Sequence, residues 1–343
     1  MRTHVLWLIP LLAASIPIRA SDKPKRDGKA LIEEAEDKAN IFALPSFEMQ
    51  AKVRIENRGK ILEGSYQFLW NGPEEWREEL AIPGYSEIQV GMKGMIYLKR
   101  TTEVLQLRIQ QLHRALGYGS AAPSNSSFVR MDPLPTEQIN NIHDRTIKGV
   151  KLFCVEIESE KGGGGSGRAV CINSSSGMPV RGEPYREESW EPVGTKMFPS
   201  HLSYIENGKY LVDIEITGFK IPRTFPPSTF EPPVGSTSRR GCMNPVPVYS
   251  LNSPQLTHIE FQHVDRTNMP INELPASRPR LGGQALIYSV IGTDGVPQNV
   301  RVIAGDDPAW TSAFVSMIKK TEFAPATCDG QAVEVEMINA FVY

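Results

Sequence analysis

The sequence has no block of basic residues. Lys and Arg together number 37 against 39 Asp and Glu, and the formal net charge of the 343 residues is −2. Binding to the backbone of a nucleic acid requires a row of cationic side chains that neutralise several phosphates. We therefore predict no nucleic-acid partner. With 40% hydrophobic and 22% charged residues the composition is that of an ordinary globular protein, and the length predicts two domains.

Local catalytic and metal-binding signatures are also missing. The sequence contains no Gly-x-Ser-x-Gly elbow, no Gly-Lys-Ser/Thr phosphate loop and no Cys-x-x-Cys pair. The close histidine pair, His258 and His263, has an odd spacing that would put the rings on opposite faces of a strand. Residues 162–167 satisfy the dinucleotide-binding spacing, but no helix follows them. We predict a non-enzymatic protein without a cofactor or metal, although a dispersed catalytic triad would leave no local signature.

A long apolar run is missing too. Val5–Ile18 is apolar but is interrupted by Pro10 and Pro17, and it is shorter than the roughly 20 residues that span a bilayer. A positive amino terminus precedes it, and a small residue, Ala20, stands before Ser21, which is the pattern of a cleaved secretory signal. We expect cleavage between these two residues and a mature chain without a stable transmembrane anchor. An uncleaved anchor is the alternative.

The four cysteines form an even number, which predicts disulfides in an exported chain. Cys154 and Cys171 lie in two strand-like runs joined by a glycine-rich loop, and the midpoint between them falls inside that loop. A hairpin that turns there places the two side chains opposite each other at a separation that suits a disulfide. Cys242 would then pair with Cys328. A zinc site is the alternative, but no histidine stands at ligand spacing.

Residues 21–234 show the period-two alternation of antiparallel strands. Asp27 caps a predicted helix, apolar and polar residues alternate over 47–55 and again over 62–70, and shorter runs follow. A second helix is predicted from about residue 102 to 116, and a strong hairpin surrounds Asn207-Gly208. This pattern predicts a curved antiparallel sheet folded over helices.

The order of these elements and the closing phrase Phe230–Pro233 resemble the half-barrel of LolA/LolB-like lipoprotein carriers. The resemblance implies that the concave face of the sheet binds the acyl chains of a lipid-like ligand. The side chains that would line such a face are Phe47, Met49, Tyr66, Phe68 and Trp70. Side chains of this kind more often form an ordinary core, which is the alternative.

The last sixty residues carry four consecutive local signals. Gln284–Ile291 is a β-branched and aromatic run, Asp294-Gly295 suits a hairpin turn, and Val300–Ala304 returns as a second strand. Asp307 then caps a helix with apolar residues at helical spacing, and Val333–Tyr343 closes the chain as a strand.

This segment, with its Gly283–Ile291 strand and its Phe323–Ala326 phrase, resembles the C-terminal domain of TonB-like proteins. The resemblance implies a periplasmic strand–helix sandwich that binds extended peptides of outer-membrane receptors by adding them as a strand. Alternate residues of the closing strand would carry this binding: Val333, Val335, Met337, Asn339 and Phe341. The sequence shows neither the anchor nor the long proline-rich spacer of energy-transducing members, so we expect docking rather than energy transfer.

Taken together, these patterns predict an α+β fold with four parts. They are a signal peptide (1–20), a half-barrel domain (21–234), a proline-rich linker with a short strand at Leu256–Phe261 (235–281) and a TonB-like domain (282–343). We predict an exported, periplasmic envelope protein that binds an extended peptide of an envelope or outer-membrane protein. The alternative is a periplasmic carrier or sensor of a lipid-like or lipoprotein-like ligand.

Overall fold

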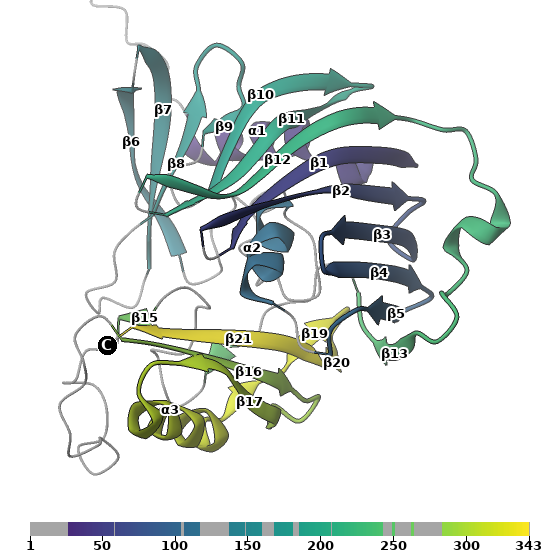
Figure 1. Ribbon diagram of the computed structural model, residues 1–343. Coiled ribbons are helices and arrows are strands. Elements are labelled where there is room, and N and C mark those ends of the chain that lie inside the picture. The colour runs from purple at the N-terminus through teal and green to yellow at the C-terminus, as the bar shows by residue number, and fades with distance from the viewer. Residues whose placement is uncertain are drawn as a thin grey trace, which may run out of the picture.

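The computed structural model describes residues 27–57, 59–103, 106–116, 137–147, 149–159, 168–180, 185–206, 208–242, 249–250, 262–263 and 283–342 (Figure 1). The predicted cleavage site at Ala20 and Ser21 lies outside these residues, as does the predicted strand Leu256–Phe261. Within the described ranges, no helix combines the length and the apolar character needed to cross a membrane. The predicted α+β fold class is confirmed.

The largest element is a curved antiparallel sheet of nine strands, which we call the half-barrel (Figure 1). Its strand order is β10-β11-β12-β1-β2-β3-β4-β5-β13. Burial alternates along strands such as β1, so that one face of the sheet lies inside the molecule. The strands are β1 (Phe47–Asn57), β2 (Lys60–Trp70), β3 (Glu75–Ile82), β4 (Tyr85–Met92), β5 (Met95–Arg100), β10 (Tyr185–Val193), β11 (Lys196–Glu206), β12 (Lys209–Lys220) and β13 (Thr237–Arg240).

A tight turn at Pro83-Gly84 joins β3 to β4. Gly84 has a φ of 78°, a conformation that glycine adopts without the steric cost of a Cβ atom. Because the turn is so short, it fixes the register of the two strands and places Glu78 directly opposite Gln89. Both side chains are buried on the concave side of the half-barrel.

The first helix packs on a second, smaller sheet. Helix α1 (Gly28–Ala39) begins after Asp27, whose carboxylate accepts a hydrogen bond from the Lys29 N–H. Its buried residues Ile32 and Ala35 contact Val155 and its neighbours in this sheet. The sheet contains β6 (Glu137–Ile147), β7 (Val150–Ser159), β8 (Arg168–Asn173) and β9 (Pro179–Val180).

The sequence predicts one curved sheet for residues 21–234. The cysteine hairpin of β7 and β8 instead belongs to a separate sheet and does not continue the half-barrel. A period-two pattern identifies the buried face of a strand but not the strands that flank it. Two short 3₁₀ helices, η1 (Ile41–Ala43) and η2 (Pro227–Phe230), complete this part of the chain.

The C-terminal module, residues 283–342, is built on a sheet of order β15-β21-β16-β17 with one helix, α3 (Pro308–Lys320) (Figure 1). Asp307 caps α3 as predicted. The first strand, β15 (Gln262–His263), lies within the predicted linker and runs parallel to the end of β21. The other elements are β16 (Gln284–Ile291), β17 (Pro297–Gly305), β21 (Val335–Val342) and four short strands, β14 (Tyr249–Ser250), β18 (Phe323–Ala324), β19 (Ala326–Cys328) and β20 (Gln331–Val333).

The two faces of this module's sheet have different partners. On one face, Ile287 and Phe341 pack against α3, where the rings of Phe341 and Phe314 stack with centroids 4.3 Å apart. On the other face, Tyr288 and Ile338 belong to the hydrophobic core of the half-barrel. The module is thus docked on the half-barrel through a shared apolar core.

Both disulfides expected from the sequence are present. Cys154 bonds to Cys171 across neighbouring strands of the small sheet, with a Cα separation of 4.0 Å. Cys242 bonds to Cys328 with a Cα separation of 5.9 Å. Because Cys242 follows β13 and Cys328 ends β19, the second bond joins the half-barrel covalently to the C-terminal module.

Candidate functional site

The concave face of the half-barrel is apolar over β1 and β2. The five residues predicted to line a lipid pocket all lie there and are at most 3% exposed. Their rings pack against one another and against neighbouring strands: the Phe47 ring lies 6.1 Å from that of Trp70 and 5.1 Å from that of Phe219. These residues, Phe47, Met49, Tyr66, Phe68 and Trp70, form one continuous core with residues of β11 and β12.

Helix α2 (Leu107–Leu116) fills the concave side (Figure 1). It contacts β1, β11 and β12, and Ile109, Leu112 and Leu116 are fully buried in the core of the half-barrel. These residues follow the i, i+3, i+7 spacing of one helical face, as the sequence predicts. Leu105, which the sequence also placed on this helix, lies outside the described residues.

The concave face becomes acidic at β3 and β4. Trp76, Glu78 and Leu80 alternate with partly exposed residues and share the buried face of β3. Glu87 lies on the buried face of the adjacent strand β4, opposite Leu80. We call Glu78 and Glu87 the acidic pair. Each is 2% exposed, so two carboxylates are buried on this face, beside Gln89 and the apolar residues Trp76 and Leu80.

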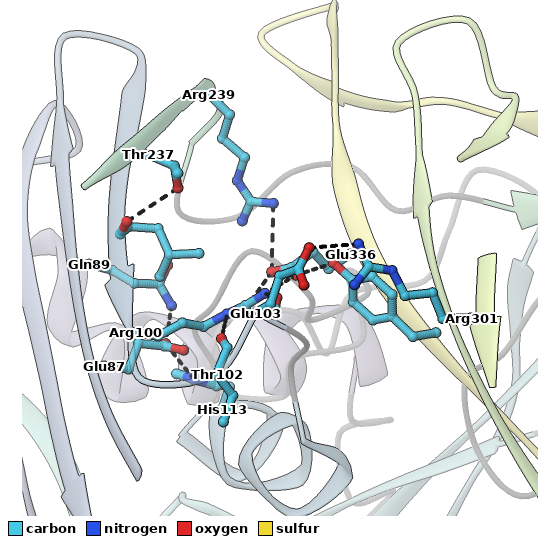
Figure 2. Close-up of polar contacts among 12 residues, drawn as sticks. Glu87, Gln89, Arg100, Thr102, Glu103, His113, Thr237, Arg239, Arg301 and Glu336 are labelled. Carbon is cyan, nitrogen blue, oxygen red and sulfur yellow. Dashed lines mark hydrogen bonds and ion pairs between the residues drawn. The ribbon is translucent and has the colours of Figure 1, made fainter. Parts of the chain in front are cut away.

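His113 of α2 bridges the acidic pair. Its Nδ1 lies 2.9 Å from Glu78 Oε1, and its Nε2 lies 3.1 Å from Glu87 Oε1. These are ion-pair distances, although the angles at both ring nitrogens fall short of hydrogen-bond geometry. Glu87 also accepts hydrogen bonds from the Tyr85 hydroxyl and, at 2.5 Å, from the Gln89 side-chain amide (Figure 2 shows Glu87, Gln89 and His113).

The electrostatics of this cluster favour a positive imidazole between two negative carboxylates. Burial alone would lower the pKa of His113, but the charges of Glu78 and Glu87 outweigh burial and hold that pKa well above its ordinary value. Burial alone would raise the pKa of Glu87, but the charge of His113 and the hydrogen bonds from Tyr85 and Gln89 lower it to about 2.

The same cluster is also a candidate metal site. Among the described residues, the possible ligand atoms of Glu78, Glu87 and His113 lie within 4.8 Å of one another, which is close enough to hold a metal ion. However, the imidazole presents a different nitrogen to each carboxylate. One histidine can offer only one nitrogen to a given ion. The arrangement is therefore better described as an imidazolium held between two carboxylates than as three ligands around a metal.

A second polar cluster lies where the half-barrel meets the C-terminal module. Arg100 of β5 donates two hydrogen bonds to Glu336 of β21, at 2.9 Å and 2.5 Å (Figure 2). Tyr288 donates a further hydrogen bond to Glu336, and Arg239 of β13 approaches the same carboxylate at 3.9 Å. Burial would raise the pKa of Glu336, but the hydrogen bonds and charge of Arg100 outweigh it and lower that pKa.

The predicted peptide-binding residues of the closing strand are buried in the C-terminal module. Val335, Met337 and Phe341 pack on the α3 side, and Val333 joins the same core. Asn339 is 3% exposed. Val333 lies in the short strand β20, and the other four residues lie in β21. Strand β21 pairs with β16 on one side, and on the other side β15 pairs with its end.

The sequence reading missed Glu78, Glu87 and His113. A signal was present for two of them: Glu78 holds a core position in the alternation of β3, and His113 lies four residues after Ile109 on the apolar face of α2. A charged residue at a core position is uncommon unless it is paired. What the sequence did not supply was the pairing, since the helix and the strands meet only in the fold.

No protein-family model and no curated protein matches this sequence. Among solved structures, a LolA superfamily protein from Nitrosomonas europaea is 14% identical with a TM-score of 0.37, over 60% of this chain and 98% of its own. A DUF1329 family protein from Desulfovibrio piger is 11% identical with a TM-score of 0.37, over 58% of this chain and 97% of its own. The MucA/MucB complex of Pseudomonas aeruginosa matches with 13% identity and a TM-score of 0.30, over 88% of this chain and 100% of the matched chain. All three TM-scores lie below 0.5, so these likenesses define neither a ligand nor a partner for this chain.

Proposed function

We propose that this protein is an exported carrier or sensor of a lipid-like ligand in the bacterial cell envelope, and that an acyl chain of the ligand binds on the concave face of the half-barrel. The observation that carries the proposal is the position of α2. This ten-residue helix covers the concave face with aliphatic side chains, which have the same chemistry as an acyl chain.

Exchange of α2 for an acyl chain would keep the apolar face covered. The sheet residues would stay away from water, and burial of the acyl chain would offset the exposure of Ile109, Leu112 and Leu116. The exchange would also release Gln110, whose side-chain amide is fully buried with neither polar atom hydrogen-bonded. An unsatisfied buried amide costs about 1–3 kcal/mol, which weakens the docking of α2 relative to an all-apolar helix.

A contact experiment tests this proposal. Trp70 and Trp76 lie on the concave face, while Trp310 lies in the core of the C-terminal module. Brominated dodecanol, a neutral probe, quenches the fluorescence of a tryptophan that its chain touches. We expect quenching by the ligand in the mature protein, loss of part of it in either Trp70→Phe or Trp76→Phe, loss of most of it in the double variant, and full retention in the control Trp310→Phe. Quenching that depends on Trp310, or no quenching at all, would contradict the proposal.

The C-terminal module has a second candidate function, which is strand addition of an extended envelope peptide by a TonB-like domain. The observation that favours it is the outer strand β17, which pairs only with β16 among the described residues and exposes Val302 and Ile303. An unpaired, apolar edge is suited to strand addition. We therefore propose β17, rather than β21, as the edge that receives the peptide.

Calorimetric titration with extended peptides of outer-membrane receptors tests this second candidate. Val302→Lys should weaken binding if the peptide adds to β17. Glu334→Lys, beside β21, is the control and should leave binding unchanged. Equal loss in both variants would point to a general charge effect, and loss in the control alone would return the site to β21.

A further inference from the structure

We propose that the acidic pair, Glu78 and Glu87, forms a recognition site for the cationic head of the ligand, and that His113 with α2 is a built-in substitute for that ligand. This inference rests on the proposed lipid-binding function and adds the chemical class of the ligand to it. The ligand would be an amphiphile with an acyl chain and a primary ammonium group.

The lining of the concave face has an apolar region next to an acidic one. On one concave face, an aromatic and aliphatic region over β1 and β2 continues into the carboxylates on β3 and β4. Helix α2 matches both parts at once, since Leu112 and Leu116 cover the apolar region while His113 reaches Glu78 and Glu87. The helix therefore presents aliphatic groups next to a cation, which is the pattern of a cationic amphiphile.

The buried negative charges of Glu78 and Glu87 require a cation beside them. Two buried carboxylates are costly unless a cation compensates them. Among the described residues, His113 is the cationic side chain that contacts either carboxylate. Arg100 lies across from Glu87 on the neighbouring strand and its charge reaches that carboxylate, but its hydrogen bonds go to Glu336 and to the backbone oxygens of Thr102 and Glu103. If α2 leaves, the acidic pair loses the cation that contacts it, and Glu78 in particular is left without one, so a cationic group of the ligand would take the place of the imidazole.

The carboxylates of Glu78 and Glu87 are both directed toward the position of the imidazole. Tyr85 and Gln89 donate hydrogen bonds to Glu87 and hold it toward the position of the imidazole. Glu78 Oε1 and both nitrogens of His113 lack hydrogen bonds of good geometry although they are buried. A primary ammonium carries three donors on one tetrahedral atom and can direct them to several acceptors. It would satisfy the two carboxylates better than the flat ring does.

The test compares three probes of equal chain length, dodecylamine, dodecanol and dodecanoate, each titrated into the mature protein below its critical micelle concentration. We expect the amine to bind about tenfold more tightly than the alcohol, and the carboxylate to bind more weakly than the alcohol. Tenfold corresponds to 1.4 kcal/mol, the lower end of what a hydrogen bond to a charged group contributes. A short-chain phosphatidylethanolamine and an acylated peptide with a free amine then distinguish a lipid headgroup from a lipoprotein as the source.

Variants separate recognition of the head from binding of the chain. Glu78→Gln should bring the ratio of amine affinity to dodecanol affinity close to one, whereas the control Glu63→Gln, at an exposed carboxylate, should leave this ratio unchanged. His113→Gln should raise the affinity for the amine about tenfold, because the built-in cation no longer competes. Circular dichroism identifies any variant that fails to fold, and either variant alone is sufficient for the test.

Two results would overturn the inference. If all three probes bind equally, or if Glu78→Gln retains the preference for the amine, the concave face binds acyl chains but the acidic pair does not select the head group of the ligand. If no probe binds, the lipid-binding function fails and the inference fails with it. The two failures are distinguishable. If only the selection of the head fails, the brominated probe still quenches the fluorescence of Trp70, whereas failure of the lipid-binding function abolishes this quenching.

Discussion

Arg100 and Glu336 form a two-pronged ion pair although 236 residues separate them in the sequence. Their side chains are only 8% and 7% exposed. Arg100 ends a strand of the half-barrel and Glu336 lies in the last strand of the C-terminal module. The pair therefore ties the two parts together at a point shielded from water, where loss of one partner leaves the other charge buried.

We expect Arg100→Met to reduce the free energy of unfolding by about 3–5 kcal/mol, the usual effect of breaking a buried ion pair. Urea unfolding monitored by circular dichroism measures this change. Arg301→Met is the matched control, because Arg301 pairs with Glu103 across the same junction but in solvent, where ion pairs contribute little. An equal loss in both variants would show that burial of the pair is unimportant.

The stability contributed by the bridge between His113 and the acidic pair should decrease both at high pH and at low pH. The pKa of His113 is raised by folding, so its contribution is complete below its unfolded value of about 6.5 and is lost as the pH rises through the folded value. The pKa of Glu87 is lowered to about 2, so its contribution is present above its unfolded value of about 4.3 and is lost as the pH falls toward about 2.

The difference in unfolding free energy between wild type and His113→Gln should therefore be largest between about pH 4.5 and 6.5. Chemical unfolding in buffers on both sides of this range measures it. Charged groups near the imidazole are Glu78 and Glu87 from the sheet, and Tyr85 keeps its proton because burial raises its pKa. A difference that rises steadily above pH 7 would contradict the prediction.

The Cys242–Cys328 bond should stabilise the protein more than the Cys154–Cys171 bond does. It closes a segment of 86 residues against 17 for the shorter one. In the chain-entropy model, the longer closure contributes about 4–5 kcal/mol and the shorter about 3 kcal/mol. Paired Cys→Ser variants of each bond, compared by thermal unfolding, test this order. The reverse order would mean that local packing at the shorter bond outweighs chain entropy.

Gly91 on β4 should not tolerate a side chain. A Cβ atom at this position would lie 2.1 Å from Nε1 of Trp76, which covers the glycine from the neighbouring strand. We expect Gly91→Ala to displace the Trp76 ring and to cost about 1–3 kcal/mol, as overpacking of a core does. Thermal unfolding and tryptophan fluorescence measure both effects. In the control Gly218→Ala the new Cβ would approach nothing closer than 3.9 Å, and a comparable loss there would contradict the steric argument.

Much of the fold could be predicted because its signals are local. The spacing of apolar residues places the end of α2 correctly at residue 116, although the helix begins at Leu107 and not near residue 102, and Asp307 marks the start of α3. The hairpin argument also paired Cys154 with Cys171. Each of these depends on residues that are near one another in sequence, where helix and strand periods determine which side chains share a face.

The sequence could not predict which faces meet. Glu336 alternates with the apolar residues of the last strand, which is the pattern of a polar face, yet it is buried against Arg100. Its burial follows from the docking of the C-terminal module on the half-barrel, which adds a second apolar neighbour to that face of β21. A residue's alternation gives its side of the strand but does not say whether that side meets solvent or another sheet.

For this protein, the sequence by itself determined the α+β class, the positions of most helices and strands and the cysteine pairs, because these follow from short-range periodicity and turn chemistry. Only the tertiary structure decided that His113 lies between Glu78 and Glu87. These residues come from one helix and two strands, and each carboxylate is tolerable in the core only when the cation is beside it. That condition depends on the packing of α2 on the concave face, which no local pattern specifies.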